Sequence, residues 1–222
     1  MSDTATAAPV KPLLRGWFHP FAALASLVAT VILLFRTAHD MPRFVSVLIF
    51  GLSMVLLFVV SSVYHIGNWS PKVRAVLRAF DHSNIYVLIA GTYTPICVIV
   101  LHGWMRVFVL TLVWSVAIAG MSTSWVSTKL PKWATSGIYI AMGWIVVIPM
   151  PTLFDRLPSV AIVTLFLGGL SYTIGGAIYA MKRPNPFPRV FGYHEIFHLL
   201  VVTGAAFFAS VIWIWIVPLP RV

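Results

Sequence analysis

Charged residues are scarce in this chain of 222 residues: Asp, Glu, Lys and Arg make up 9% of it, whereas hydrophobic residues make up 60%. A soluble globular domain carries about 25% charged residues, so an ordinary water-soluble fold is excluded. Acidic residues are rarest, five against fifteen Lys and Arg, which gives a formal net charge of +10. Because the basic residues are scattered between apolar stretches, nucleic-acid binding is not expected. The composition predicts a polytopic membrane protein.

Cysteine pairs, a cleavable signal and internal repeats are also missing. Cys97 is the single cysteine, so it cannot form an intramolecular disulfide and is expected to pack as a small apolar residue. The first apolar stretch is too long for the core of a secretory signal, and no small-residue cleavage site follows it. The absence of a repeat disfavours a transporter built from duplicated halves.

Long charge-free intervals, in contrast, are abundant. A helix that crosses a bilayer needs about 20 apolar residues. Seven intervals without Asp, Glu, Lys or Arg reach this length: Gly16–Phe35, Phe44–His65, His82–Met105, Val107–Thr128, Trp133–Phe154, Leu157–Met181 and Ile196–Pro220. They predict an all-α bundle of seven transmembrane helices forming one membrane domain, residues 16–222. An Ala/Thr/Pro-rich tail, residues 1–15, is expected to be disordered and cytoplasmic.

The distribution of basic residues predicts the orientation, because cytoplasmic loops carry an excess of Lys and Arg. One side of the predicted bundle holds ten: Lys11, Arg15, Lys72, Arg74, Arg78, Lys129, Lys132, Lys182, Arg183 and Arg189. The other side holds five: Arg36, Arg43, Arg106, Arg156 and Arg221. The N-terminus is therefore predicted in the cytoplasm and the C-terminus outside.

Three local patterns add detail. In the connection Ile66–Asp81, apolar residues recur at helical spacing opposite basic ones, which indicates a short amphipathic helix on the inner leaflet. A basic loop that only follows the charge rule explains this connection equally well. Pro95 is expected to kink the third span. The glycines of the sixth span, such as Gly168 and Gly175, are expected to let helices pack closely.

Ionisable residues within spans are costly in lipid and mark candidate functional sites. His65 closes the second span, Asp81 opens the third, and His194 and His198 open the seventh. Because these span ends lie on the same side of the membrane, the residues are predicted at one depth. His194 and His198 are four residues apart and so project from one helical face, as do Ser61 and His65.

Three imidazoles beside a carboxylate suit Zn²⁺, and a catalytic zinc site has three protein ligands and an open position. We therefore expect His65, His194 and His198 to bind a metal. Hydrogen bonding between helices is the preferred interpretation of His19 and His82, and Asp81 is equally well explained as a helix cap.

The segment from His194 to His198 also matches H-E-x-x-H, a pattern of zinc metalloproteases in which the Glu is the general base. An intramembrane metalloprotease would need a further ligand, typically an Asp in a later helix. No acidic residue follows Glu195, so this requirement is not met.

Three elements stand in order along the chain: Ser61-Ser62-Val63-Tyr64-His65, then Asp81 sixteen residues further on, then His194-x-x-x-His198. Together with Phe80–Ile85, Gly91–Pro95 and Tyr193–His198, they resemble the progestin and adipoQ receptor family, above all its short bacterial form, hemolysin III. The resemblance covers all seven predicted helices. It departs from many eukaryotic members in the first helix, where an Asn and a Glu are replaced by Gly16-Trp17-Phe18-His19.

The resemblance implies a zinc ion held by His65, His194 and His198. Asp81 would act as a catalytic residue that holds or deprotonates the zinc-bound water, and Ser61 would hydrogen-bond that water or the substrate. Members are grouped with alkaline ceramidases as membrane hydrolases of lipid amides. This implies a lipid-amide hydrolase that influences membrane lipid homeostasis in the inner membrane of a bacterial cell. Hormone-receptor function is not expected to carry over.

Two other function classes remain open. A non-catalytic, receptor-like regulator would use a structural zinc, whose site is closed by a fourth protein ligand. A proton or ion transporter would use the intramembrane His and Asp as a relay, although the outer halves of the spans carry almost no ionisable groups. Membrane lipids are the expected partners in each case, and the oligomeric state is left open.

Overall fold

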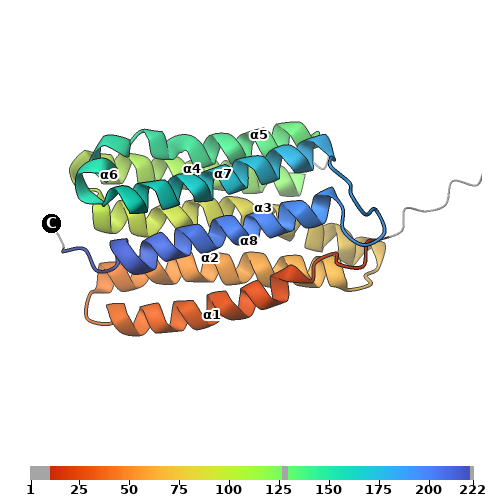
Figure 1. Ribbon diagram of the computed structural model, residues 1–222, viewed down its shortest axis with the longest axis horizontal. Helices are drawn as coiled ribbons and strands as arrows, with labels where there is room; N and C mark the ends of the chain where they lie inside the picture. Colours follow the sequence, from red (N-terminus) through yellow and green to blue (C-terminus); the bar gives the residue numbers. More distant parts are fainter. Residues whose placement is uncertain (1–10, 127–129, 221–222) are drawn as a thin grey trace, which may run out of the picture.

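A computed structural model describes residues 11–126 and 130–220, which form a bundle of long helices along a common axis (Figure 1). The α-helices are α1 (Phe18–Thr37), α2 (Met41–Ile66), α3 (Pro71–Pro95), α4 (Gly103–Val126), α5 (Lys132–Gly143), α6 (Met150–Arg156), α7 (Ser159–Met181) and α8 (Tyr193–Val211). Within these ranges there is no β-strand, only an isolated bridge between Phe187 and Phe191. The all-α prediction is confirmed.

The helices are long and apolar enough for a multi-pass membrane protein. Six of them qualify as spans by themselves, and a pair of shorter helices between α4 and α7, Lys132–Val147 and Met150–Arg156, bent by 53°, brings the number to seven when it is counted as one span. Pro149 lies at the break, where a residue without an N–H cannot continue the helical hydrogen bonds. The predicted span Trp133–Phe154 is therefore wrong as a continuous helix. The direction in which the bundle crosses the membrane stays a prediction.

The third span begins earlier than expected. Pro71 starts α3, and Ser70 caps it by accepting a hydrogen bond from the Val73 N–H at 3.5 Å, a favourable Ser-Pro start. The amphipathic segment within Ile66–Asp81 is thus the beginning of α3 and not a separate helix or a loop. One continuous helix consequently carries Arg74, Arg78 and Asp81.

Pro95 changes the helix type. The residues after it, Ile96–Val100, form a π-helical turn, as occurs where the regular hydrogen-bond ladder is interrupted. Cys97 lies in this turn and is fully buried, which agrees with its predicted packing role. The end of α8 is similar, because Ile212–Ile216 also form a π-helical turn.

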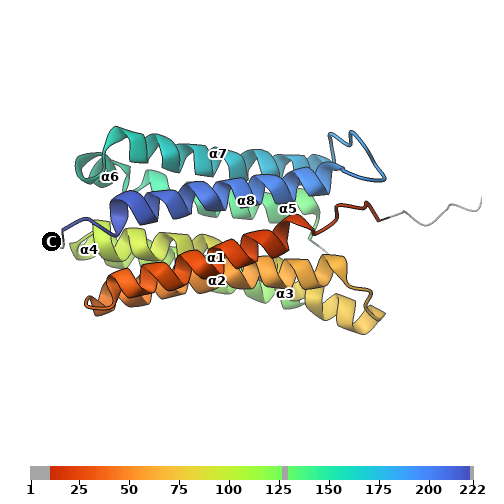
Figure 2. The same ribbon diagram turned by 60° about the horizontal axis from the view of Figure 1, so that its bottom comes forward.

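Small residues bring α7 and α8 together, and the two helices lie side by side in both ribbon views (Figures 1 and 2). A Cβ at Gly168 would lie 3.0 Å from the Phe208 ring, and one at Gly175 would lie 3.3 Å from Leu200 Cβ. Gly204 of α8 in turn lies against the Tyr172 ring of α7. The predicted packing role is confirmed for Gly168 and Gly175, whereas Gly169 has open space around it.

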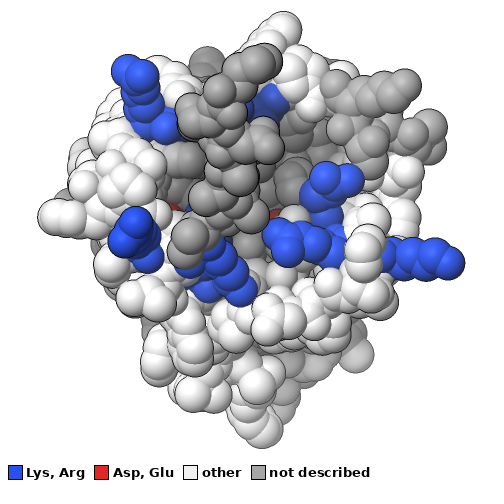
Figure 3. Space-filling model, turned by 90° about the vertical axis from the view of Figure 1, so that its right-hand side faces the viewer, with Lys and Arg blue, Asp and Glu red and all other residues white. Residues whose placement is uncertain are grey.

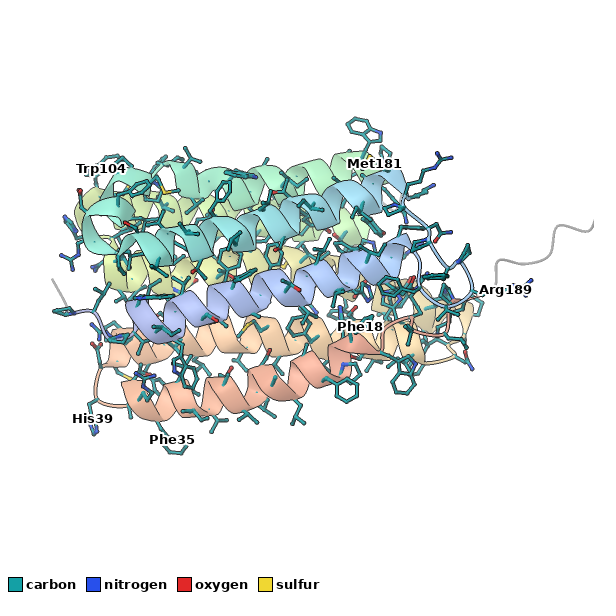
Figure 4. All side chains as sticks on the ribbon, viewed as in Figure 1. Phe18, Phe35, His39, Trp104, Met181 and Arg189 are labelled. Carbon is teal, nitrogen blue, oxygen red and sulfur yellow. The ribbon has the colours of Figure 1, made fainter. Side chains whose placement is uncertain are left out.

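The two ends of the bundle differ in charge. Met181 and Arg189 mark one end and His39 and Trp104 the other (Figure 4). We call the first the basic end. The N-terminal segment, the starts of α3 and α5 and the chain that follows α7 lie there (Figure 1), and Lys and Arg gather on this face (Figure 3). These segments contain Lys11, Arg15, Lys72, Arg74, Arg78, Lys132, Lys182, Arg183 and Arg189. Lys129, Arg221 and residues 1–10 of the predicted tail lie outside the described residues.

Candidate metal centre

The three predicted metal ligands meet at the basic end. His65 lies in the last turn of α2, and His194 and His198 lie in the first two turns of α8. Their ring centroids are 4.5–4.8 Å apart, and one ligand nitrogen from each lies within 4.8 Å of the other two. The spacing of four residues within α8 puts both of its imidazoles on the face toward α2, so the helix pair assembles the cluster.

The cluster fits a metal ion by its unpaired nitrogens. His194 Nε2 and His198 Nδ1 are buried without a hydrogen-bond partner in the described chain, and the buried His65 Nε2 has only the Asp81 carboxylate nearby, at 3.7 Å. Buried polar atoms are costly when unpaired, and a bound cation would satisfy them. The three nitrogens are close enough together for one ion to be held by all three. Imidazole suits several transition metals, zinc among them.

Asp81 lies beside this cluster. Its Oδ2 is 3.7 Å from His65 Nε2 and 3.8 Å from His82 Nδ1, and the buried Ser61 lies one helical turn before His65 on α2. The helix-cap interpretation of Asp81 is wrong, because α3 starts at Pro71 and Ser70 is its cap. Asp81 therefore occupies the interior of a helix, where its side chain is directed at the histidines.

A fourth imidazole belongs to the same cluster. His19, in the first turn of α1, is 3% exposed, and its ring centroid lies 4.2 Å from that of His198. Neither of its ring nitrogens has a hydrogen-bond partner among the described residues, so the expected bond between helices finds no support. His82 differs, because its Nδ1 lies 2.7 Å from the Arg78 carbonyl of its own helix.

The Glu195 carboxylate is held by contacts at the start of α8. It is fully buried, its Oε2 accepts a hydrogen bond of 2.8 Å from the Gly192 N–H, and its Oε1 pairs with Arg15 Nε. Both oxygens are thus occupied at the start of α8. The general base of an H-E-x-x-H protease must be directed at the metal, so the protease interpretation loses its central residue.

The end of the predicted tail, residues 11–15, is ordered and lies over this region. The Leu13 N–H donates to the Arg189 carbonyl at 3.0 Å, which ties the chain to the loop before α8. Gly16 has φ +84°, and a Cβ there would lie 2.7 Å from His65 Cβ. Only glycine tolerates both the left-handed backbone and this close approach. The N-terminal segment therefore crosses directly over a candidate ligand.

A cavity of about 840 Å³ extends from the metal centre into the bundle. It is lined at the basic end by Arg74 and Lys132, at the metal centre by the histidines and Asp81, and further in by mostly apolar side chains. These apolar residues include Leu88, Ile89, Ile96, Met150, Ile162, Leu165 and Phe208. Its volume lies within the roughly 300–1,000 Å³ typical of small-molecule sites.

Comparison with known proteins links these features to a family. A model of haemolysin-III related proteins matches residues 8–209, a range that contains every candidate site residue. A hemolysin-3 homolog of Bacillus subtilis (strain 168) is 35% identical over 190 residues, 85% of this chain and 86% of that protein. Hemolysin-3 of Bacillus cereus is 31% identical over 202 residues, 90% and 89% of the two chains. Monocyte to macrophage differentiation factor of Homo sapiens is 28% identical over 201 residues, 88% and 80% of the two chains.

Proposed function

Because the chain belongs to the haemolysin-III related family of multi-pass membrane proteins, we propose that it is a zinc-dependent hydrolase of lipid amides. It would act in the inner membrane of a bacterial cell, with its basic end in the cytoplasm as the charge distribution predicts. One observation carries the proposal: three clustered imidazole nitrogens and a carboxylate line a largely apolar cavity.

The histidines and Asp81 divide the chemistry. His65, His194 and His198 would hold the metal through the ring nitrogens that lie within 4.8 Å of one another. When bound, zinc supplies a Lewis acid that polarises a carbonyl oxygen and lowers the pKa of water. Asp81 accepts the proton of the attacking water and returns it to the amine as the C–N bond breaks, which leaves a fatty acid and a neutral amine. Ser61, which lines the same cavity, would hydrogen-bond the attacking water or the substrate.

The apolar part of the cavity binds the acyl chain. Each methylene taken from water contributes about 0.8 kcal/mol, so chain burial supplies affinity without polar contacts. Basic, acidic and histidine side chains in the cavity lining occur only near the basic end. An acyl chain would therefore extend away from the metal centre, with its amide at the depth of Asp81. The same distribution disfavours the transport alternative, because a proton relay would end at this depth.

Metal content tests the site first. Protein purified in detergent without chelators is expected to contain about one zinc per chain. The double variant His194→Ala/His198→Ala is expected to lose it, whereas His102→Ala, an exposed histidine at the opposite end, keeps it. Release of fatty acid from ceramides and other N-acyl amides in mixed micelles then tests the activity. Wild-type protein without metal, or zinc-loaded protein that hydrolyses none of these amides, would contradict the proposal.

One observation favours a second function. Asp81 Oδ2 lies close enough to His65 Nε2, at 3.7 Å, for the carboxylate to become a fourth ligand. A site closed by four protein ligands is structural, and the protein would then be a non-catalytic membrane regulator. X-ray absorption spectroscopy separates the two functions: three histidines with a water ligand support the hydrolase, and a directly bound Asp81 supports the regulator.

A further inference from the structure

The cavity ends, at the basic end of the bundle, in a rim of cationic side chains. Arg74 and Arg78 of α3 and Lys132 of α5 line the same cavity as the candidate metal ligands. We call these three residues the cationic rim. Lys and Arg side chains gather on this face of the molecule, and hardly any Asp or Glu is visible there (Figure 3).

The cationic rim lacks carboxylate partners in the described part of the chain. Arg15, which also lines the cavity, is neutralised by Glu195, but no rim residue forms a salt bridge. Lys132 Nζ instead lies 4.1 Å from the centroid of the Tyr179 ring, and the Arg74 guanidinium lies 5.9 Å from that of Tyr64. Cation–π contacts hold such groups in place but leave their positive charge and N–H donors for a ligand.

Other cations crowd the same place. Lys11 Nζ donates to the Ile66 carbonyl at 3.1 Å, and burial together with the nearby Arg74 and Arg15 guanidinium groups lowers the pKa of Lys11. The carboxylate of Asp81, which also lines the cavity, is directed at two histidines. The rim is thus the part of the cavity lining where positive charge accumulates, which attracts anions.

The order of residues along α3 sets the distance between the rim and the metal centre. Arg74, Arg78, His82, Ile85 and Ile89 line the cavity at helical spacing, so cations come first and apolar residues last. A helix rises about 1.5 Å per residue along its axis. Measured along α3, Arg78 therefore lies about 4.5 Å before Asp81, and Arg74 lies about 10 Å before Asp81. The first residues of α5 follow the same order, with Lys132 ahead of Ser136, Tyr139 and Ile140.

From this arrangement we propose that the lipid amide bound in the cavity carries an anionic group, a carboxylate or a phosphate, on the amine side of its amide bond. The cationic rim binds that group. The inference rests on the proposed function for the amide and names its head group. An N-acyl amino acid has the required shape: its chain lies beyond the metal centre, its amide lies at Asp81, and its carboxylate reaches the rim. Arginine suits both anions, because its planar fork donates two parallel hydrogen bonds.

Binding of a matched pair of amides tests the head group without requiring turnover. N-oleoylglycine and N-oleoylethanolamine share the chain and the amide, and differ in a carboxylate against a hydroxyl. Purified protein in neutral detergent is expected to bind the carboxylate about 10-fold more tightly at low salt, and less selectively at high salt. Equal affinities for the two amides would overturn the proposal.

Charge-matched variants locate the preference. Arg74→Gln/Arg78→Gln/Lys132→Gln is expected to bind both amides equally, and its retained affinity for N-oleoylethanolamine shows that it is folded. Lys72→Gln/Arg183→Gln/Arg189→Gln removes the same charge from exposed positions at the same end that do not line the cavity. This control is expected to keep the preference, and a loss of the preference in both triple variants would refute a specific rim.

Two further binding measurements test where the preference for the carboxylate comes from. Inorganic phosphate at millimolar concentration is expected to displace N-oleoylglycine only weakly, because it has no chain to bury. Complete displacement by phosphate would make the rim a site for free anions and overturn the lipid assignment. The His194→Ala/His198→Ala protein is expected to retain the preference, since the rim does not require the metal. Failure of hydrolysis with the preference intact would therefore contradict the proposed function alone.

Discussion

Arg15 holds the start of α8 through its ion pair with Glu195, and removal of its charge is the sharpest test of that arrangement. Arg15→Met would leave the Glu195 carboxylate, which is fully buried, without its counter-charge. Breaking a buried pair by removing one partner costs about 3–5 kcal/mol. The Arg15 side chain is 21% exposed, so in the variant water partly solvates the Glu195 carboxylate in place of the guanidinium. The expected loss of stability is therefore about 2–3 kcal/mol.

A double variant separates charge from packing. Glu195→Gln keeps an oxygen for the Gly192 N–H but removes the negative charge, so Arg15→Met/Glu195→Gln is expected to recover at least half of the loss. Equilibrium unfolding in mixed micelles, followed by tryptophan fluorescence, measures each step. Lys72→Met, an exposed control at the same end, should change stability by less than about 0.5 kcal/mol.

The outcome also decides the role of the H-E-x-x-H segment. If Glu195 is structural, the double variant should retain its metal and any hydrolase activity, because the pair lies at the helix start. If Arg15→Met costs less than about 0.5 kcal/mol, the ion pair does not hold α8 and the reasoning is refuted. A stable double variant without activity would restore the general-base interpretation of Glu195.

Three more predictions follow from the same contacts. Asp81→Asn should retain zinc by elemental analysis and lower amide hydrolysis by about 10²–10⁴-fold; unchanged turnover would exclude Asp81 as the proton acceptor. His19→Asn should weaken zinc binding by about 10–100-fold in a chelator competition, because the His19 ring packs against the candidate ligand His198; unchanged affinity would leave it a packing residue. Gly204→Ala should destabilise the bundle by about 1–3 kcal/mol through a clash with Tyr172, measured by unfolding, whereas Gly169→Ala, with open space around it, should not.

The errors in the predicted helices share a cause. Charge-free intervals locate segments that fit hydrocarbon, but a helix continues wherever its backbone hydrogen bonds remain intact. α3 therefore begins at Pro71, well before the interval that opens at His82. Ser70-Pro71 is a local helix-start signal, and the helix that it begins continues into the span without a break. The break at Pro149 was likewise signalled by proline.

The candidate site was predicted in part. The spacing of His194 and His198 and the shared depth of His65 and Asp81 were sufficient to place these residues together. His19 occupies the same depth, and that signal could have included it. Which face of α1 meets α8 depends on the packing of the two helices, so its contact with His198 could not be derived from spacing.

The sequence alone determined the helical class, the succession of spans and the depth of the ionisable residues, because a bilayer admits only segments whose backbone hydrogen bonds are satisfied internally. The tertiary structure alone decided which polar groups meet. Glu195 could have been directed at the histidines, yet it pairs with Arg15 from a segment 180 residues away in the chain. Arg74 and Lys72 contribute equally to the charge count, but only Arg74 lines the cavity. Rotation and packing of helices distinguish such residues, and both depend on contacts across the whole bundle.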